Sequence, residues 1–162
     1  MVKAAALTIS DRSFAGQRED ASGKIMVAML QDGLGLTEVH AEIVPDEQQI
    51  IEETLRRWAD AGSYDLIITS GGTGISPRDV TPQATLNVVA YEVPGLAEVM
   101  RMVSLRKTPM AALSRAVVGV RGRTLIINLP GSPKGVRECL EAVTPVLPHA
   151  LEQLAGGWGH GK

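Results

Sequence analysis

Three segments in the first half of the chain have the hydrophobic pattern of β-strands. They are Ala4–Ile9, Thr37–Val44 and Asp65–Thr69. The first and third are apolar runs, typical of buried strands, whereas the second alternates as a half-buried strand does. Two segments with apolar residues at helical spacing separate them, from Ser22 to Gly33 and from Asp46 to Gly62. This order predicts an α/β fold, a three-layer domain whose largely parallel sheet is flanked by helices.

The second half continues the helical pattern and then returns to strands. Thr81 suits an N-cap and Pro82 the first helical position, and a Pro-Gly pair at 94–95 interrupts the helical stretch that ends at Leu105. Two strands and a last helix follow, at Ala116–Val120, Thr124–Leu129 and Val136 to about Leu154, and the helix is expected to be kinked or split at Pro145 and Pro148. We expect residues 1–155 to form a single domain and residues 156–162 a flexible glycine-rich tail.

The composition is that of a globular protein. Of the 162 residues, 44% are hydrophobic and 21% charged, which argues against wholesale disorder. The net charge of −2 and the aromatic content of 3% argue against nucleic-acid binding. Cys139 is the only cysteine, so we expect a buried, inert thiol and a reducing compartment. No apolar run approaches the length of a membrane span, about 20 residues, and we expect a cytoplasmic protein.

The segment from Ser70 to Ala84, with the sequence SGGTGISPRDVTPQA, is the most informative stretch of the chain. It joins a predicted strand to a predicted helix, so the backbone N–H groups of its glycines can converge on an anion. Arg78 suits a phosphate and Asp79 a hard cation. The alternative is a tight turn with an Arg78–Asp79 surface ion pair. Two familiar phosphate motifs are absent, since no lysine follows the glycines and Pro77 interrupts a GxGxxG pattern.

Two other loops also leave the ends of predicted strands, and each carries an aspartate. They are Ser10–Asp20 and Pro45–Asp46. In open α/β sheets, ligands bind at the carboxyl ends of the strands, where all three loops meet. Asp46 has an alternative role as a helix N-cap, with Gln49 completing a capping box. Ser10 and Asp11 have an alternative role in an Asx-turn.

With these segments in view, the chain resembles the molybdopterin adenylyltransferase family of molybdenum-cofactor biosynthesis, the MogA and MoaB type. The matching segments extend over nearly the whole chain: Ser10-Asp11 with Gly16, Asp20 and Ser22-Gly23; Pro45-Asp46; Gly71-Gly72-Thr73-Gly74 with Arg78-Asp79 and Thr81-Pro82; Leu113-Ser114-Arg115; and Leu129-Pro130-Gly131-Ser132-Pro133. One departure is Gln83, where the family usually has glutamate.

The resemblance implies a homotrimer that binds molybdopterin and ATP and transfers AMP to the molybdopterin phosphate with release of pyrophosphate. It implies Mg²⁺ as cofactor and other proteins of the pathway as upstream and downstream partners. An alternative from another class is a non-catalytic molybdopterin-binding or carrier protein of the MoaB type. A third is a different nucleotidyl transferase built on the same fold.

Residues and resemblance together assign candidate roles. Asp46 and Asp79 are the expected catalytic residues and Mg²⁺ ligands. The expected nucleotide and phosphate ligands are Ser70, Gly71, Gly72, Thr73, Gly74, Arg78, Pro130, Gly131, Ser132 and Pro133. The expected pterin ligands are Ser10, Asp11, Ser104, Ser114 and Arg115. Lys134 suits a phosphate or a purely solvated position equally well.

Overall fold

A six-stranded sheet forms the middle layer of the protein. The computed structural model describes residues 1–157. The strands lie in the order β2-β1-β3-β6-β5-β4, and their bounds are Ala4–Ile9 (β1), Val39–Val44 (β2), Leu66–Ser70 (β3), Tyr91–Glu92 (β4), Val118–Arg121 (β5) and Thr124–Leu129 (β6). The first four strands in this order pair in parallel, and β5 and β4 add antiparallel. The predicted α/β fold with a largely parallel sheet is confirmed.

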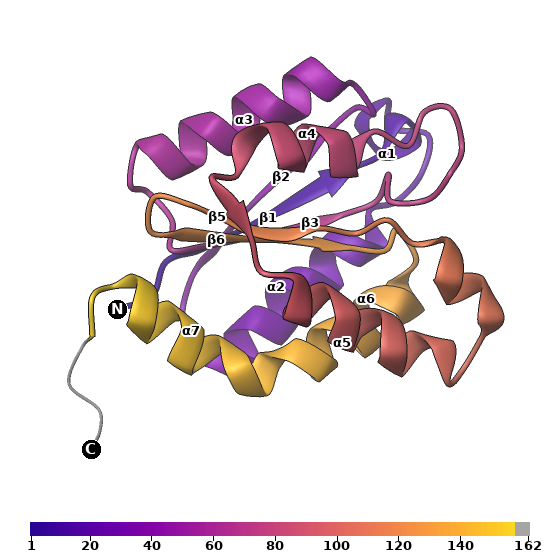
Figure 1. Ribbon diagram of the computed structural model, residues 1–162. Coiled ribbons are helices and arrows are strands. Elements are labelled where there is room, and N and C mark those ends of the chain that lie inside the picture. The colour runs from indigo at the N-terminus through magenta and orange to yellow at the C-terminus, as the bar shows by residue number, and fades with distance from the viewer. Residues whose placement is uncertain (158–162) are drawn as a thin grey trace.

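Helices cover both faces of the sheet, as Figure 1 shows. They are α1 (Asp11–Phe14), α2 (Ala21–Leu34), α3 (Gln48–Asp60), α4 (Thr81–Val88), α5 (Pro94–Leu105), α6 (Pro133–Val143) and α7 (Leu147–Leu154), with 3₁₀ turns η1 (Pro109–Leu113) and η2 (Thr144–Val146). Helices α3 and α4 lie on one face, and α2, α5, α6 and α7 lie on the other (Figure 1). The predicted three layers are therefore present. Among residues 1–157, no helix combines the length and apolar character needed to cross a membrane.

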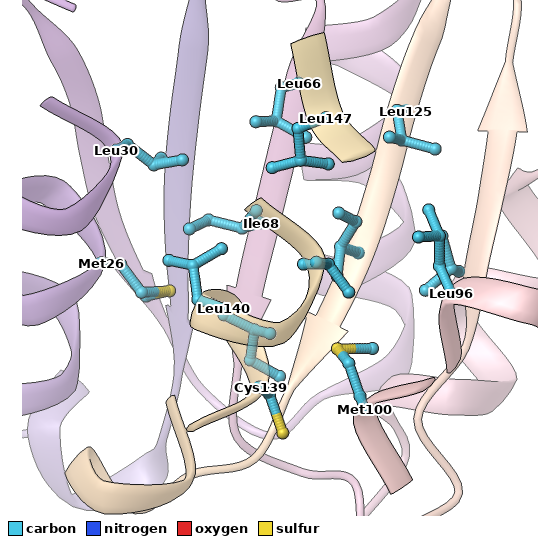
Figure 2. Packing of buried hydrophobic residues seen from close by; sticks show 14 of the residues in the cluster. Met26, Leu30, Leu66, Ile68, Leu96, Met100, Leu125, Cys139, Leu140 and Leu147 are labelled. Atoms are coloured by element: carbon cyan, nitrogen blue, oxygen red, sulfur yellow. The ribbon is translucent and has the colours of Figure 1, made fainter. Parts of the chain in front are cut away.

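Alternation along the central strands divides the core into two clusters. Leu66 and Ile68 of β3 face α2 and α6, whereas Ile67 between them belongs to the cluster under α3 and α4. Figure 2 shows the first cluster, in which Ile68 packs close to Leu140 of α6. Because both faces of β3 are covered, its sequence is apolar throughout, as in other buried parallel strands.

Several local predictions need correction. The last helix begins at Pro133 rather than Val136, because the Ser132 hydroxyl caps it by accepting a 3.0 Å hydrogen bond from Gly135 N–H. The turn η2, which contains Pro145, splits α6 from α7, as predicted. Strand β4 and helix α1 were not predicted, since two and four residues give too little periodic signal. Of the predicted tail, residues 158–162 lie outside the described part of the chain.

The connections place a topological switch point at the carboxyl ends of β1 and β3. The chain leaving β1 enters α2 on one face of the sheet, whereas the chain leaving β3 enters α4 on the opposite face. In open α/β sheets, ligands bind near such a switch point. The loop after Ile9 and the loop after Ser70 both begin at this point.

Candidate functional site

The loop after β3 is held in a conformation that needs glycine. Gly71 and Gly72 have φ angles of +105° and +67°. A Cβ on Gly71 would lie 2.2 Å from the carbonyl oxygen of Ile9, so only glycine allows this approach of β3 to β1. Thr81, expected to be an N-cap, instead opens α4, and its hydroxyl donates a 2.9 Å hydrogen bond to the Gly71 carbonyl. The turn is therefore fixed by the close approach to Ile9 and by the Thr81 hydroxyl.

The backbone N–H groups that follow Gly71 are the second feature of this loop. Among the described residues, the backbone N–H groups of Gly72, Thr73 and Gly74 find no hydrogen-bond acceptor. Their carbonyls are held instead, because Thr81 N–H donates to Gly72 O at 3.1 Å and Arg115 N–H donates to Thr73 O at 2.8 Å. Successive free N–H groups in a fixed loop form a binding site for an anion. We call residues 71–74 the glycine loop.

The loop after β6 lies directly against the glycine loop. The Ser70 hydroxyl donates to the Pro130 carbonyl at 2.8 Å, and the Ser22 hydroxyl donates to the Gly131 carbonyl at 2.8 Å. A Cβ on Gly131 would lie 3.4 Å from the Gly71 Cα, so the two loops are in van der Waals contact. Two loops from distant parts of the sequence, both predicted to bind phosphate, are thus brought together.

Asp46 lies beside the glycine loop, in partnership with Asp11. Asp11 N–H donates to Asp46 Oδ2 at 2.9 Å, and Asp46 N–H donates to Asp11 Oδ1 at 3.0 Å. The capping-box prediction is therefore wrong, because Glu47 occupies the N-cap position of α3 without a side-chain cap. Burial raises the pKa of Asp46 above its ordinary value of 3.8, and the negative charges of Asp11 and Asp79 add to this effect.

Asp46 and Asp79 both face the glycine loop and have the donor atoms that Mg²⁺ prefers. Asp46 Oδ1 lies 3.2 Å from the position of a Cβ on Gly72, and Asp79 Oδ2 lies 2.8 Å from that on Gly74. Each carboxylate uses its Oδ2 to accept one backbone N–H, from Asp11 and from Ser76, so each Oδ1 is free for a cation. Within residues 1–157 no group of three or more His, Cys, Asp or Glu side chains is arranged for a metal. Two carboxylates completed by substrate oxygens are, however, a common Mg²⁺ environment.

Arg78 joins this cluster rather than pairing with Asp79. Its guanidinium donates two hydrogen bonds to Asp11, at 2.9 and 3.0 Å, and one to Glu47 at 3.1 Å. These bonds raise the pKa of Arg78 and lower that of Asp11. The alternative of an Arg78–Asp79 surface pair is therefore wrong, and the arginine instead links the loop after β3 to the loop after β1.

Arg115 supports the glycine loop from the side. Its guanidinium donates to the carbonyls of Gly74 and Asp79, both at 2.8 Å, and to Gln83 Oε1 at 3.1 Å. These three contacts tie the two ends of segment 74–83 together. Arg115 thus holds the loop that carries Asp79, and Gln83, the departure from the resembled family, lies opposite it.

A cavity of about 320 Å³ opens on the α5 and α6 side of the glycine loop. Thr73 and Gly74 are part of its lining, which is mainly apolar and includes Ala97 and Met100 of α5. Two of the expected pterin ligands, Ser104 and Ser114, line this cavity, whereas Ser10, Asp11 and Arg115 do not.

The lining also includes polar residues that sequence reasoning did not single out, Lys107 and Glu138. Lys107 follows the end of a predicted helix and Glu138 has the sequence context of an exposed helix position, so no local signal pointed to them. Lys134 lines the cavity too, with its ammonium group largely exposed.

Comparison with known proteins relates this arrangement to one family. The model of a probable molybdopterin binding domain matches residues 5–149, a range that includes both loops and the cavity. The chain belongs to this molybdopterin-binding family, of the MogA and MoaB type. The molybdopterin adenylyltransferase of Helicobacter pylori strain J99 is 46% identical over 153 residues, which cover 94% of this chain and 87% of that protein.

Solved structures of the MogA and MoaB type have the same fold. The molybdopterin biosynthesis enzyme MoaB from Thermus thermophilus superimposes with a TM-score of 0.86 at 54% identity, covering 96% of this chain and 98% of that one. The molybdopterin biosynthesis Mog protein from Mycobacterium ulcerans has a TM-score of 0.89 at 42% identity, with 95% and 99% of the two chains covered. The family resemblance predicted from the sequence is confirmed.

Proposed function

We propose that this protein transfers AMP from ATP to the phosphate of molybdopterin, giving adenylyl-molybdopterin and pyrophosphate. The observation that carries the proposal is the row of free N–H groups from Gly72 to Gly74, which borders both the cavity and the carboxylates of Asp46 and Asp79. The proposed phosphate site thus lies between the cavity and the two carboxylates, so that one ligand can approach it from each side. The name shared by the curated relatives, molybdopterin adenylyltransferase, supports this reaction.

The geometry suggests how the two substrates divide the site. The pterin ring occupies the apolar cavity near Ser104 and Ser114, with its phosphate toward the glycine loop. The phosphates of ATP lie on the side of Asp46 and Asp79, against the glycine loop and the loop at 130–133. Ser10 and Asp11 lie outside the cavity, so we assign them to positioning: Ser10 caps α1, and Asp11 holds Asp46 and Arg78.

The chemistry needs position and charge more than a base. The second pKa of a phosphate monoester is about 6, so its oxygen is already ionised at neutral pH. That oxygen forms a bond to the α-phosphorus of ATP while the bond from this phosphorus to the bridging oxygen breaks, and pyrophosphate leaves. The two substrates are polyanions that repel each other as they approach. The N–H groups of Gly72, Thr73 and Gly74 reduce this repulsion by donating hydrogen bonds to the phosphate oxygens.

We further propose that Asp46 and Asp79 hold Mg²⁺ that arrives with the nucleotide. Both carboxylates lie beside the glycine loop, and each keeps an Oδ1 that accepts no hydrogen bond from the described residues, which fits this role. When bound, Mg²⁺ neutralises part of the phosphate charge. Arg78 donates its hydrogen bonds to Asp11 and Glu47 rather than to Asp46, which leaves the Asp46 carboxylate without a hydrogen-bonded cation.

The test is pyrophosphate release from ATP with Mg²⁺ and molybdopterin, in wild type and Asp79→Asn. Asparagine keeps an oxygen that can accept the Ser76 N–H, so the loop survives while the charge is lost. The exposed Asp32 of α2 gives a matched control, Asp32→Asn. We expect pterin-dependent release that falls at least about a hundred-fold in Asp79→Asn, that stays unchanged in Asp32→Asn, and that stops when EDTA removes Mg²⁺.

Two other outcomes would identify the alternatives. Tight molybdopterin binding without any pyrophosphate release would make the chain a molybdopterin-binding or carrier protein. Equal turnover with unrelated phosphate acceptors would make it a different nucleotidyl transferase.

The family resemblance also supports a homotrimer in the cytoplasm that exchanges molybdopterin with the proteins before and after it in the pathway. Exposed apolar side chains of β4 and α5 offer a surface for such assembly, namely Tyr91, Val99, Met102 and Leu105. Light scattering at micromolar concentration tests the trimer, and a stable monomer would contradict it.

A further inference from the structure

Glu138 is a buried carboxylate that the proposed reaction does not use. It lies on α6, its residue is 9% exposed, and its Oε1 finds no hydrogen-bond donor among the described residues. Two ammonium groups lie near Oε1, that of Lys107 at 3.4 Å and that of Lys134 at 4.0 Å. The side chains of Lys107 and Lys134 are 49% and 82% exposed, and neither ammonium forms a hydrogen bond with Oε1, so they balance its charge only. A buried acceptor in this state is unfavourable until a donor reaches it, and a ligand in the neighbouring cavity can supply one.

The position of Glu138 relates this unpaired acceptor to the cavity. Glu138 lines the cavity together with Met100, Ser104 and Cys139, and Thr73 and Gly74 of the glycine loop line it as well. It follows Ser132 by six residues, which places it roughly 9 Å along the helix axis from the loop that contacts the glycine loop. A ligand with its phosphate at the loops and a flat ring between the apolar walls therefore brings the far edge of that ring to Glu138.

We propose that Glu138 recognises the amino-pyrimidinone edge of the pterin by accepting hydrogen bonds from its ring N–H and its exocyclic amino group. An ionised carboxylate only accepts, and its two oxygens match two adjacent N–H donors in one plane. The same edge of adenine places an acceptor nitrogen next to its amino group, and that nitrogen meets the carboxylate unfavourably. Glu138 thus also keeps the adenine of ATP out of the pterin cavity, which assigns each substrate to its own side of the glycine loop.

This inference rests on the proposed function, because it takes the cavity as the pterin site. The test compares two rings that differ at the recognised edge: 6-hydroxymethylpterin phosphate and 6-hydroxymethyllumazine phosphate, in which an oxo group replaces the amino group. Binding is followed by the change in ring fluorescence, without ATP. The variants are Glu138→Gln, which keeps the shape of the side chain, and the control Glu141→Gln, at an exposed position of the same helix.

We expect wild type and Glu141→Gln to prefer the pterin by about ten- to a hundred-fold, as for hydrogen bonds to a charged group. In Glu138→Gln the amide can donate to the lumazine oxygen, so the preference falls to within about threefold. A wild type that binds both rings equally, or neither, overturns the assignment without any variant. A Glu138→Gln protein that weakens both rings by the same factor also overturns it, because a residue that only shapes the cavity would act in that way.

Pyrophosphate release separates this inference from the proposed reaction. Release with molybdopterin but no ring preference contradicts the role of Glu138 alone. A ring preference without release contradicts adenylyl transfer and leaves the role of Glu138 in place.

Discussion

Replacing Gly71 by alanine tests whether the close approach of β3 to β1 shapes the glycine loop. The added Cβ would lie 2.2 Å from Ile9 O and 3.3 Å from the Ile9 carbonyl carbon. Neither backbone can move freely, because Gly71 N–H donates to Leu129 O at 3.1 Å and Ile9 lies in β1, which is paired on both sides. Alanine at Gly71 also has to adopt a φ of +105°.

Two contributions set the expected loss of unfolding free energy. A positive φ costs an L-residue about 1–2 kcal/mol. Displacing packed backbone to relieve an overlap costs typically about 1–3 kcal/mol more. We therefore expect Gly71→Ala to lose about 2–5 kcal/mol, a large part of the total for a domain of this size. Gly35 gives a matched control, because its φ is +65° and a Cβ there meets nothing within 4 Å, so Gly35→Ala loses only the first contribution.

The measurement is urea unfolding followed by far-UV circular dichroism, at one protein concentration for all variants. Pyrophosphate release, measured where each variant is fully folded, should fall in Gly71→Ala, because relief of the overlap displaces the N–H groups of Gly72 to Gly74. It should not fall in Gly35→Ala. Equal losses of stability in the two variants would refute the reasoning, since the contact with Ile9 would then contribute nothing.

Three further predictions concern single side chains. The pKa of Asp46 is raised in the folded protein, so its protonated form stabilises the fold at low pH, and this contribution is lost as pH rises through the folded-state pKa. Asp46→Asn should therefore be at least as stable as wild type at pH 7. Its urea midpoints should also vary less with pH above 3.8 than those of wild type. Gln83→Glu turns the hydrogen bond with Arg115 into an ion pair, and thermal unfolding should show a gain of less than about 1 kcal/mol that salt removes. Burial raises the pKa of the Cys139 thiol, and the charge of Glu138 adds to this effect. A disulfide reagent should therefore react with Cys139 rapidly only after the protein is unfolded in urea, and fast reaction of the folded protein would contradict this.

The fold could be predicted from the sequence because its signals are local. The apolar runs of β1 and β3 and the stripes of α2 and α3 are readable within a few residues, and they specify the parallel sheet. The capping role predicted for Asp46 failed for a non-local reason. Helix α3 begins one residue later than predicted, with Glu47 at the N-cap, and the Asp46 carboxylate instead accepts a hydrogen bond from Asp11 N–H, 35 residues away in the sequence.

The site shows the same division between local and distant information. The glycine loop could be predicted because glycine, a preceding strand and a following Thr-Pro are contiguous. The partner of Arg78 could not, since Asp11 is 67 residues away and Asp79 is adjacent in sequence. Glu138 has the sequence context of an exposed helix position, and only the packing of α5 and α6 around the cavity buries it.

The charges around the glycine loop explain how a phosphate site can be rich in carboxylates. The two arginines beside it are already engaged, Arg78 by Asp11 and Glu47, and Arg115 by backbone carbonyls and Gln83. Positive potential for a ligand therefore comes from backbone N–H groups, whereas Asp46 and Asp79 oppose a free polyanion. We infer that this side of the loop favours a nucleotide that carries its own cation. On the cavity side of the loop, the carboxylate of Glu138 disfavours binding of adenine. The carboxylates on the two sides of the glycine loop therefore each weaken the binding of one wrong ligand, and in this way they assign ATP and the pterin to different sides.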